Sequence, residues 1–273
     1  MAAPVATVHP LVRRITAANG GPFTATGTQT HIVGHGRVAV IDPGPALDAH
    51  IEALLAAVAG ETVAAILCTH THRDHSPGAA PLAAATGAPV LGCAPVAGAG
   101  FDESYAPARV LADGEAVTGP GWTLRALATP GHTSNHLCFL LPEARALFSG
   151  DHVMGWSTSV VIPPDGHMGA YLASLERLLD LDVDTYFPAH GDPVAQPARL
   201  VRRMIGHRRQ REGQILRLLG EGVAGVPEMV ERLYVGLDPR LVRGAEASVL
   251  AHLQHLAERD RVRQDGPRWA LAA

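Results

Sequence analysis

Residues 70–75 (HTHRDH) crowd three imidazoles and one carboxylate into six positions. They directly follow the apolar run 64–68, which is typical of a buried strand. A strand that ends in such a loop can aim several side chains at one point. Imidazole nitrogen and carboxylate oxygen are preferred ligands of zinc, and they also bind iron or manganese. Because no fold needs so many polar side chains at a strand end, the segment predicts a metal site.

Three more candidate ligands lie far along the chain, and each follows a strand-like run. They are His132 after Thr-Pro-Gly, Asp151 after Ser-Gly, and His190 after Pro-Ala. The repeated order of strand, ligand and glycine-containing turn indicates one metal site at the strand ends of an α/β fold. A lone histidine is more often an ordinary core or surface residue. Four others match no such order and are expected not to bind metal: His35, His136, His152 and His167.

These ligands need strands that end close together, and residues 1–198 carry the pattern for them. Helical spacing of leucine, isoleucine and alanine predicts helices at 47–58 and 170–179. Strands that alternate with helices indicate layered α/β packing in a first domain, 1–198. Runs rich in branched and aromatic residues predict strands at 38–41, 64–68, 90–91, 122–128, 137–141, 146–148 and 185–187.

A second, smaller domain is predicted over residues 199–273, where the charge changes sign. The first 198 residues hold 8 Arg and 17 acidic residues, and the remainder hold 14 Arg and 9 acidic residues. Three helices and a terminal hairpin would form a winged-helix-like α domain. The helices are expected at 197–219, 227–234 and 244–259, and Asp265-Gly266 marks the hairpin turn between 261–264 and 268–271.

This small domain raises the alternative of a ligand-sensing transcriptional regulator. Its third helix would enter the DNA groove, yet it carries no Arg or Lys between Arg243 and Arg259, and Gln254 alone could read a base. No sequence-specific DNA binding is therefore expected. The first helix instead carries an Arg cluster, either as a solvated or salt-bridged face or as a groove for an anionic substrate such as RNA phosphate or a phosphopantetheine arm. The cluster is Arg202, Arg203, Arg208, Arg209 and Arg211.

The composition of the 273 residues indicates a globular protein, with 47% apolar residues and a formal net charge of −4. That charge gives no reason to expect strong nucleic-acid binding by the whole chain. The odd number of cysteines argues against a disulfide framework, and Cys68, Cys93 and Cys138 are expected to be buried thiols in strands. Residues 1–11 lack a signal-peptide pattern and no apolar run reaches about 18 residues, so a cytoplasmic protein without a membrane partner is expected. The oligomeric state stays open.

The order of the candidate ligands resembles the five-motif pattern of the metallo-β-lactamase superfamily over about residues 12–195. The pattern runs His-x-His-x-Asp-His, a lone His, a lone Asp and a last His, and Asp42 resembles the family's first motif. The resemblance implies an αββα sandwich with two metal ions at one edge between the sheets. Carried over position by position, it assigns His70, His72 and His132 to one metal, Asp74, His75 and His190 to the second, and Asp151 to a bridge between them.

The resemblance also implies a mechanism. Two zinc ions, with iron or manganese as substitutes, would share a bridging hydroxide, because metal binding lowers the pKa of water from about 15.7 to about 7. Asp74 would orient the attacking water and Asp151 would fix the separation of the metals, so these two are the candidate catalytic residues. Asp42 and Asp192 are candidates to accept the second N–H of a ligating imidazole. Asp192 has the alternative of being only a turn residue before Pro193.

Asp151 narrows the reaction that the resemblance implies, because true β-lactamases of the superfamily carry Cys or Ser there, whereas an Asp marks its glyoxalase II, nuclease, lactonase and thioesterase branches. Weak β-lactamase or lactonase activity is an alternative. Residues 150–155 (GDHVMG), 171–175 (YLASL) and 207–212 (HRRQRE) resemble a subfamily with a C-terminal winged-helix-like domain. It includes a mitochondrial single-strand endoribonuclease and thioesterases that release polyketides from carrier proteins. The implied substrate is a small-molecule or carrier-linked ester or thioester, as for glyoxalase II, or a phosphodiester in single-stranded RNA. A di-iron redox protein is a further alternative.

Two loops are candidates for the substrate side of the site. The loop at 19–24 overhangs the metals in this family, so Phe23 is expected either to contact substrate as an exposed tip or to pack as an ordinary core residue. The segment 155–165, which carries Trp156 and three Ser or Thr residues, is a candidate second wall.

Overall fold

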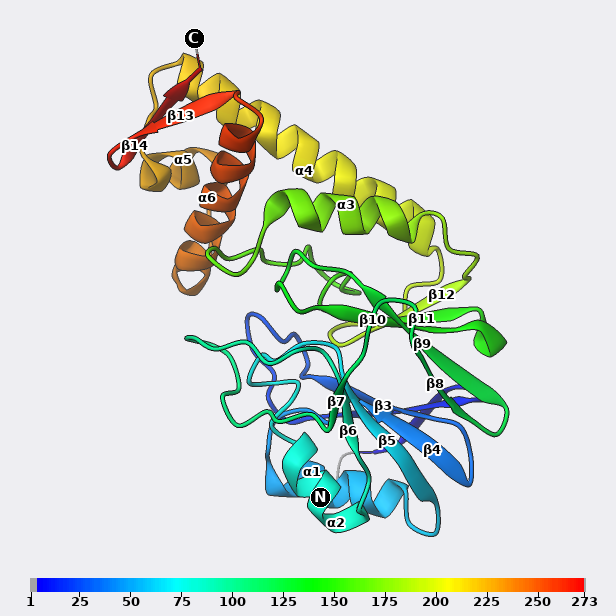
Figure 1. The fold of residues 1–273 in the computed structure, drawn as a ribbon. Coiled ribbons are helices and arrows are strands. Elements are labelled where there is room, and N and C mark those ends of the chain that lie inside the picture. The colour runs from blue at the N-terminus through cyan, green and yellow to red at the C-terminus, as the bar shows by residue number, and fades with distance from the viewer. Residues whose placement is uncertain (1–3, 273) are drawn as a thin grey trace. The chain divides into compact units, whose positions relative to one another are not determined.

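The computed structural model describes residues 4–272, which form two compact units (Figure 1). The first unit comprises the described residues up to Thr129 together with Asn135–Ser157 and Asp182–Pro197, and the second comprises Pro130–Ser134, Thr158–Leu181 and the described residues from Ala198 onward. The domain boundary expected at residue 198 stays a prediction, since two earlier segments cluster with the second unit. Residues 1–3 of the stretch expected to lack a signal peptide lie outside the described residues. Within the described part, each helix is too short or too polar to span a membrane.

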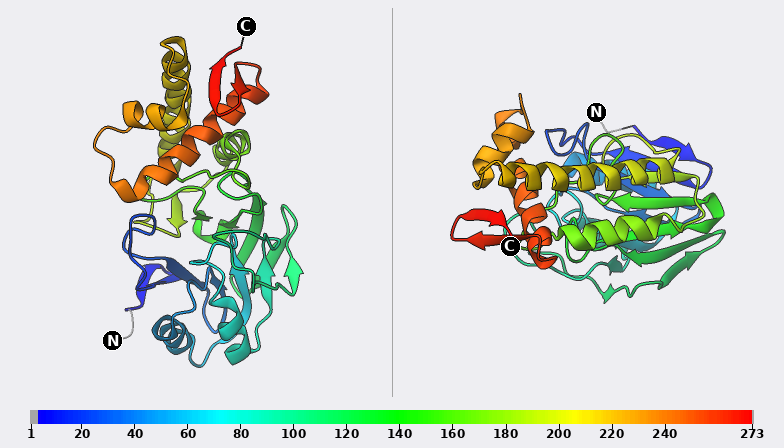
Figure 2. Two further views of the ribbon diagram at one scale, coloured as in Figure 1. Left: turned by 90° about the vertical axis from the view of Figure 1, so that its left-hand side faces the viewer. Right: turned by 90° about the horizontal axis from the view of Figure 1, so that it is seen from above.

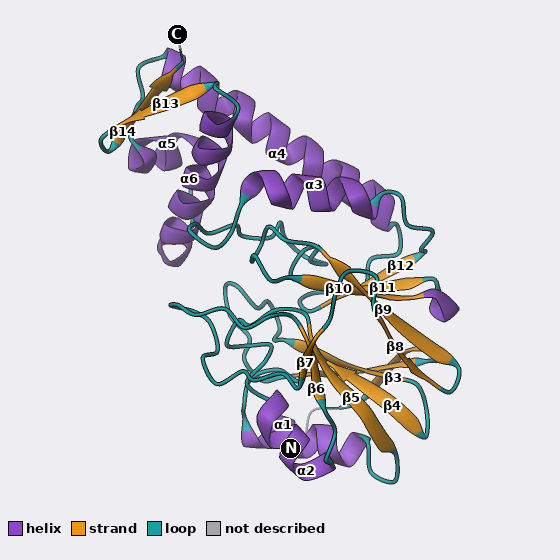
Figure 3. Cartoon of the chain, viewed as in Figure 1, coloured by secondary structure: helices purple, strands orange, loops and turns teal. Residues whose placement is uncertain are grey.

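The first unit contains two sheets, whose strands are orange in Figure 3. The larger sheet has the order β1 to β7, antiparallel as far as β4 and parallel from β4 to β7. β4 and β5 are almost fully buried, which explains their near-continuous apolar sequences RVAVI and TVAAILC. The strands are β1 (Ala6–His9), β2 (Val12–Thr16), β3 (Gln29–Val33), β4 (Arg37–Ile41), β5 (Thr62–Cys68), β6 (Val90–Gly92) and β7 (Arg109–Val110).

The smaller sheet has the order β12-β11-β10-β9-β8, in which β11 and β12 are parallel and the other neighbours antiparallel. In β9 a buried residue mostly alternates with a more exposed one, as expected where one face of a strand packs on a core. A 3-10 helix, η1 (Pro142–Ala144), joins β10 to β11. The strands are β8 (Ala116–Gly119), β9 (Trp122–Ala128), β10 (Leu137–Leu141), β11 (Ala146–Gly150) and β12 (Thr185–Pro188).

One apolar core lies between these two sheets. It joins Ile32 and Ile66 of the larger sheet to Phe139 and Phe148 of the smaller one. Helices α1 (Asp48–Ala57) and α2 (Ala79–Thr86) contact each other and the strands of the larger sheet. The α/β sandwich expected from the sequence is therefore confirmed, and each of the seven expected strands is present. One detail was wrong: Cys93 is a buried thiol as expected, but it follows β6 in a bend and does not lie in a strand.

The second unit is mainly helical. Helices α3 (Met168–Leu178) and α4 (Pro197–Gly220) run side by side (Figure 2) and are linked by an ion pair between Arg209 and Glu176. α4 is the first of the three expected helices, and the other two and the hairpin follow it, with a separate core that includes Ile215, Val249 and Trp269. The remaining elements are α5 (Val226–Leu233), the 3-10 helix η2 (Pro239–Leu241), α6 (Val242–Glu258), β13 (Val262–Asp265) and β14 (Arg268–Leu271).

The Arg cluster on α4 is not one exposed face, and that expectation was wrong. Arg208 and Arg211 retain only 3% and 8% of their exposure. The guanidinium of Arg208 lies over the ring of Tyr171 and donates to the carbonyl of Ser159, and that of Arg211 lies over Tyr234. Planar guanidinium groups stack on aromatic rings, which is how such charges become buried. The remaining members of the cluster are exposed: Arg202, Arg203 and Arg209.

Candidate metal centre

The candidate ligands of the first unit follow the ends of three strands. Residues 70–75 come after β5, Asp151 comes directly after β11, and His190 comes two residues after β12. Because β11 and β12 are parallel, their carboxyl ends lie at the same edge of the sheet. The loops at these ends can therefore meet, as the sequence predicted.

Asp74, His75 and His190 form one group, here called the second ligand set, whose ligand atoms all lie within 4.8 Å of one another. Oδ2 of Asp74 lies 3.3 Å from Nε2 of His75 and 3.2 Å from Nε2 of His190. Asp151 lies beside this set, with carboxylate oxygens 3.6 Å from Nε2 of His75 and 3.3 Å from Nε2 of His190.

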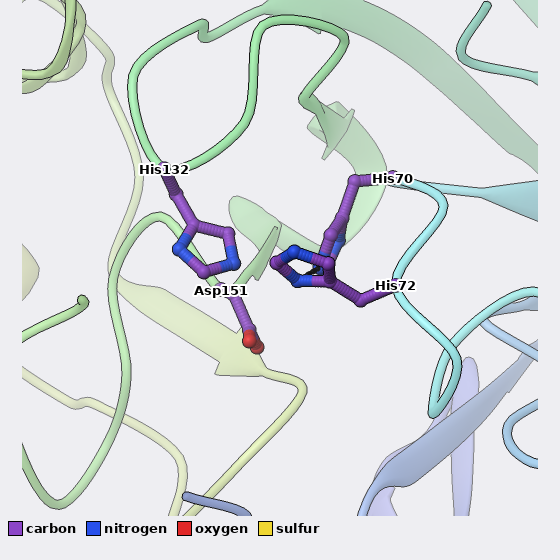
Figure 4. A group of neighbouring side chains, drawn as sticks. All are labelled: His70, His72, His132 and Asp151. Carbon is purple, nitrogen blue, oxygen red and sulfur yellow. Dashed lines mark hydrogen bonds between the residues drawn. The ribbon is translucent and has the colours of Figure 1, made fainter. Parts of the chain in front are cut away.

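The other group, here called the first ligand set, consists of His70, His72, His132 and Asp151, whose ligand atoms also lie within 4.8 Å of one another (Figure 4). Nε2 of His70 is 3.0 Å from Nδ1 of His72. The ring of His72 stacks on Phe101, with centroids 4.9 Å apart, which fixes its orientation. Asp151 thus belongs to the first set and also lies beside the second.

Hydrogen bonds select the tautomer of the histidines. Asp42, which follows β4, accepts from Nδ1 of His75 at 3.1 Å. Thr69 directs its hydroxyl proton to Asp42 at 2.8 Å, so its oxygen accepts from Nδ1 of His70 at 3.0 Å. Within the second unit, the carbonyl of Val160 lies 2.6 Å from Nδ1 of His132. In each case Nε2 keeps the lone pair that a metal needs.

His136 was expected not to bind metal, and it has a different role. The backbone N–H of Asp151 donates to its Nε2 at 3.2 Å, and its Nδ1 lies 2.8 Å from the hydroxyl of Thr129. Gly150 adopts φ +49°, and a Cβ there would lie 2.6 Å from Nε2 of His136, so glycine is required. His136 therefore holds the backbone at the shared carboxylate. No local pattern in the sequence indicated this contact.

The electrostatics of the second ligand set favour a cation. Burial opposes the charge of Asp74, but His75 and His190 outweigh it and hold the pKa of that carboxyl well below its usual range. Burial likewise opposes the charge of His190, but Asp151 and Asp74 raise the pKa of its imidazole to about 10. The half-buried Asp74 and the buried Asp151 both stay ionised, so they attract positive charge, either as imidazolium protons or as a metal ion.

The spacing of the donor atoms fits zinc. Donors bound to one zinc ion at about 2.1 Å in tetrahedral geometry lie about 3.4 Å apart. The four oxygen–nitrogen distances around His75 and His190 range from 3.2 to 3.6 Å. Nε2 of His75 is buried and faces the carboxylates of Asp74 and Asp151, as expected of an atom that would bind the same metal ion.

The structure also places the other residues that the sequence had singled out. Asp192 is exposed in the turn before Pro193. Phe23 and Trp156 are both large exposed apolar residues, at 48% and 46% exposure. Within the described residues, neither ligand set includes the four histidines expected to be non-ligands, His35, His136, His152 and His167.

Comparison with known protein families assigns this chain to a family. Residues 25–190 match the model of the metallo-beta-lactamase superfamily, and residues 226–269 match that of the beta-lactamase associated winged helix domain. The chain therefore belongs to the metallo-β-lactamase superfamily, as a hydrolase with a C-terminal winged helix. The family and the winged helix expected from the sequence are both confirmed.

Several relatives span most of the chain. The lactamase-like protein adaB of Aspergillus niger is 31% identical over 279 residues, which cover 96% of this chain and 85% of the relative. An atrochrysone carboxyl ACP thioesterase of Claviceps purpurea is 33% identical, with 79% and 67% covered. A beta-lactamase-like protein 2 homolog of Caenorhabditis elegans is 33% identical, with 80% and 74% covered.

Solved structures share the fold. A metallo-beta-lactamase family protein of Thermus thermophilus superposes with a TM-score of 0.79 at 24% identity, covering 97% of this chain and all of the other. TTHA1623, solved in a di-iron-bound form, has a TM-score of 0.55 and 29% identity, and covers 70% of this chain and 97% of its own.

Proposed function

We propose that the protein is a dinuclear zinc-dependent hydrolase that cleaves a thioester whose acyl group is held on a carrier protein. The observation that carries this proposal is the pair of ligand sets at the strand ends, with Asp151 a member of the first and in contact with His75 and His190 of the second. Two such sets around one carboxylate suit a two-metal site better than a mononuclear one. The di-iron form of TTHA1623 supports two ions, and the donor spacing supports zinc.

Metal ions in such a site polarise a carbonyl oxygen and lower the pKa of water so that a nucleophile forms near neutral pH. The chain's own residues would hold the geometry. Asp151 would span the two sets with its two oxygens, and Asp74 would accept a hydrogen bond from the attacking water. Thr69 and Asp42 would keep His70 and His75 in the ligating tautomer.

The substrate class is supported by the relatives and by the shared carboxylate. Relatives that carry the name atrochrysone carboxyl ACP thioesterase include two at 33% and 32% identity. Asp at position 151 resembles the glyoxalase II, nuclease, lactonase and thioesterase branches and not the true β-lactamases, so within these branches the names of the relatives favour the thioester. The exposed side chains of Phe23 and Trp156 offer apolar contacts that an acyl group could use.

The proposal is tested by metal analysis and a substrate panel. Protein prepared without chelator is expected to hold about two zinc ions per chain, since the ligands form two complete sets. An acyl carrier protein thioester and an acyl-pantetheine are compared with a lactone, a β-lactam and a single-stranded RNA, and the carrier thioester is expected to have the highest kcat/KM. His70→Ala serves as the inactive control.

Two outcomes would reject the proposal. A zinc content near zero after supplementation would remove the metal site. Cleavage of RNA in preference to every thioester, with a rate that falls steeply with salt, would identify a nuclease instead.

A further inference from the structure

Two adjacent residues between β2 and β3 contact two members of the second ligand set. Oγ1 of Thr28 lies 2.9 Å from Oδ2 of Asp74. The carbonyl oxygen of Gly27 lies 3.4 Å from Nδ1 of His190. A carboxylate and an imidazole of the same candidate metal site are therefore held by one short segment that is far from both in sequence.

The direction of the Thr28 hydrogen bond follows from its second partner. Nδ2 of Asn19 can only donate, and it lies 2.9 Å from Oγ1 of Thr28. The hydroxyl therefore accepts from Asn19 and directs its single proton to Asp74. A carboxylate oxygen has two lone pairs, so Oδ2 of Asp74 can accept this hydrogen bond and still coordinate a metal ion.

The segment itself is held in one conformation. Oδ1 of Asn19 accepts from the backbone N–H of Thr28 at 2.8 Å, and Thr28 is fully buried. Gly27 adopts φ +130°, and a Cβ there would lie only 2.0 Å from the carbonyl oxygen of Ala17. Glycine is therefore the residue that this backbone allows. Such restraint is what a group needs if it is to orient a ligand precisely.

We propose that Asn19, Gly27 and Thr28 form a clamp that positions Asp74 and His190 for the second metal ion. Thr28 sets the rotation of the Asp74 carboxylate, and Asn19 sets the direction of the Thr28 hydroxyl. Gly27 accepts from Nδ1 of His190, so that Nε2 keeps its lone pair for the metal. These are positioning residues, and the inference rests on the two-metal hydrolase proposed above.

The clamp is tested with Thr28→Val, which replaces the hydroxyl by a methyl group of similar size. Metal-free protein is titrated with zinc against a chromophoric chelator. The affinity of one of the two sites is expected to fall about 10–100-fold, because lost partners of metal ligands typically cost that much. The other site is expected to keep its affinity, and kcat is expected to fall more than KM rises.

Two further variants distinguish a positioning role of the Thr28 hydroxyl from a mere packing role of its side chain. Thr28→Ser keeps the hydroxyl and is expected to restore the zinc affinity. Thr24→Val is the matched control, because the Thr24 hydroxyl belongs to the same loop but donates to the backbone oxygen of Asn19 at 2.6 Å. It is expected to bind both zinc ions as the parent does.

The clamp is refuted if Thr28→Val binds two zinc ions with parental affinities, or loses no more affinity than Thr24→Val. A loss of both sites, with a lower unfolding temperature of the metal-free variant, would also overturn it and show a purely structural role. A parent protein that binds no second zinc ion would reject the proposed function, and the clamp with it.

Discussion

At the scale of single residues, the site depends on hydrogen-bond acceptors as much as on ligands. Nδ1 of His75 faces a carboxylate, Nδ1 of His70 a hydroxyl, and Nδ1 of His190 a backbone carbonyl. Three chemically different acceptors thus achieve the same result, because each accepts a hydrogen bond from Nδ1 and leaves Nε2 as the nitrogen that faces a metal ion. The candidate ligand histidines follow a recognisable spacing, but the groups that accept from their Nδ1 atoms follow none. The sequence therefore predicted the histidines, but of their acceptors it predicted only Asp42.

Asp151→Asn tests the shared carboxylate at this scale. The amide keeps the size of the side chain but replaces one charged oxygen by a donor, so it can no longer face both ligand sets. Turnover is expected to fall by more than about tenfold, and the zinc content is expected to drop below that of the parent. The variant is expected to stay folded, because the apolar core lies elsewhere. Parental turnover in this variant would show that Asp151 is not shared between two metals.

At the scale of elements, a strand could be predicted from the sequence where its burial is accompanied by an apolar sequence. Strands such as β5 and β10 lie in the core and have apolar sequences that reveal them. β3 is equally buried, yet its sequence QTHIV does not indicate this, because the polar side chains of Gln29 and Thr30 hydrogen-bond to backbone groups that are distant in sequence. They donate to the carbonyl oxygens of Gly191 and Asp42, respectively. Such long-range pairings cannot be inferred from a local pattern. The same reason explains why Thr28 was not anticipated.

Helix α4 offers a matched pair of substitutions. Arg208→Gln removes a buried guanidinium from above Tyr171, so it is expected to destabilise the protein by about 1–3 kcal/mol. Arg209→Gln removes only an exposed ion pair with Glu176, and its effect is expected to stay within about 0.5 kcal/mol. Urea unfolding of the two variants checks this. Equal midpoints would mean that the stacked guanidinium does not contribute to stability.

At the scale of the whole molecule, stability is expected to depend on pH through buried neutral histidines. Burial is the main cause that lowers the pKa of His252 to about 4, with the charges of Arg208 and Arg211 adding to it and Glu212 opposing it. The unfolded chain therefore binds this proton more tightly than the folded one. The contribution of the neutral His252 to the free energy of unfolding is fully present above about pH 6.5 and is lost as the pH falls toward 4.

His252→Gln tests this dependence. Metal-free protein is used, so that release of bound metal ions at low pH cannot contribute. The free energy of unfolding of the parent is expected to fall by on the order of 2–3 kcal/mol more than that of the variant between pH 7 and pH 4. Urea unfolding at a series of pH values measures the two slopes. Parallel curves would show that His252 does not titrate differently in the folded and unfolded chain.

The position of β12 has a consequence for how the protein is made. His190 follows this strand and emerges from the ribosome about 115 residues after His75, roughly 6–23 s later at ~5–20 residues per second. Residues 70–75 (HTHRDH) therefore leave the ribosome well before His190 is available to complete the second ligand set. Because β12 pairs with β11 in parallel, His190 can reach its place only after the smaller sheet has formed. Loading of the two proposed metal ions would thus be a late event of biosynthesis, and an ion bound early by residues 70–75 alone would still be free to exchange.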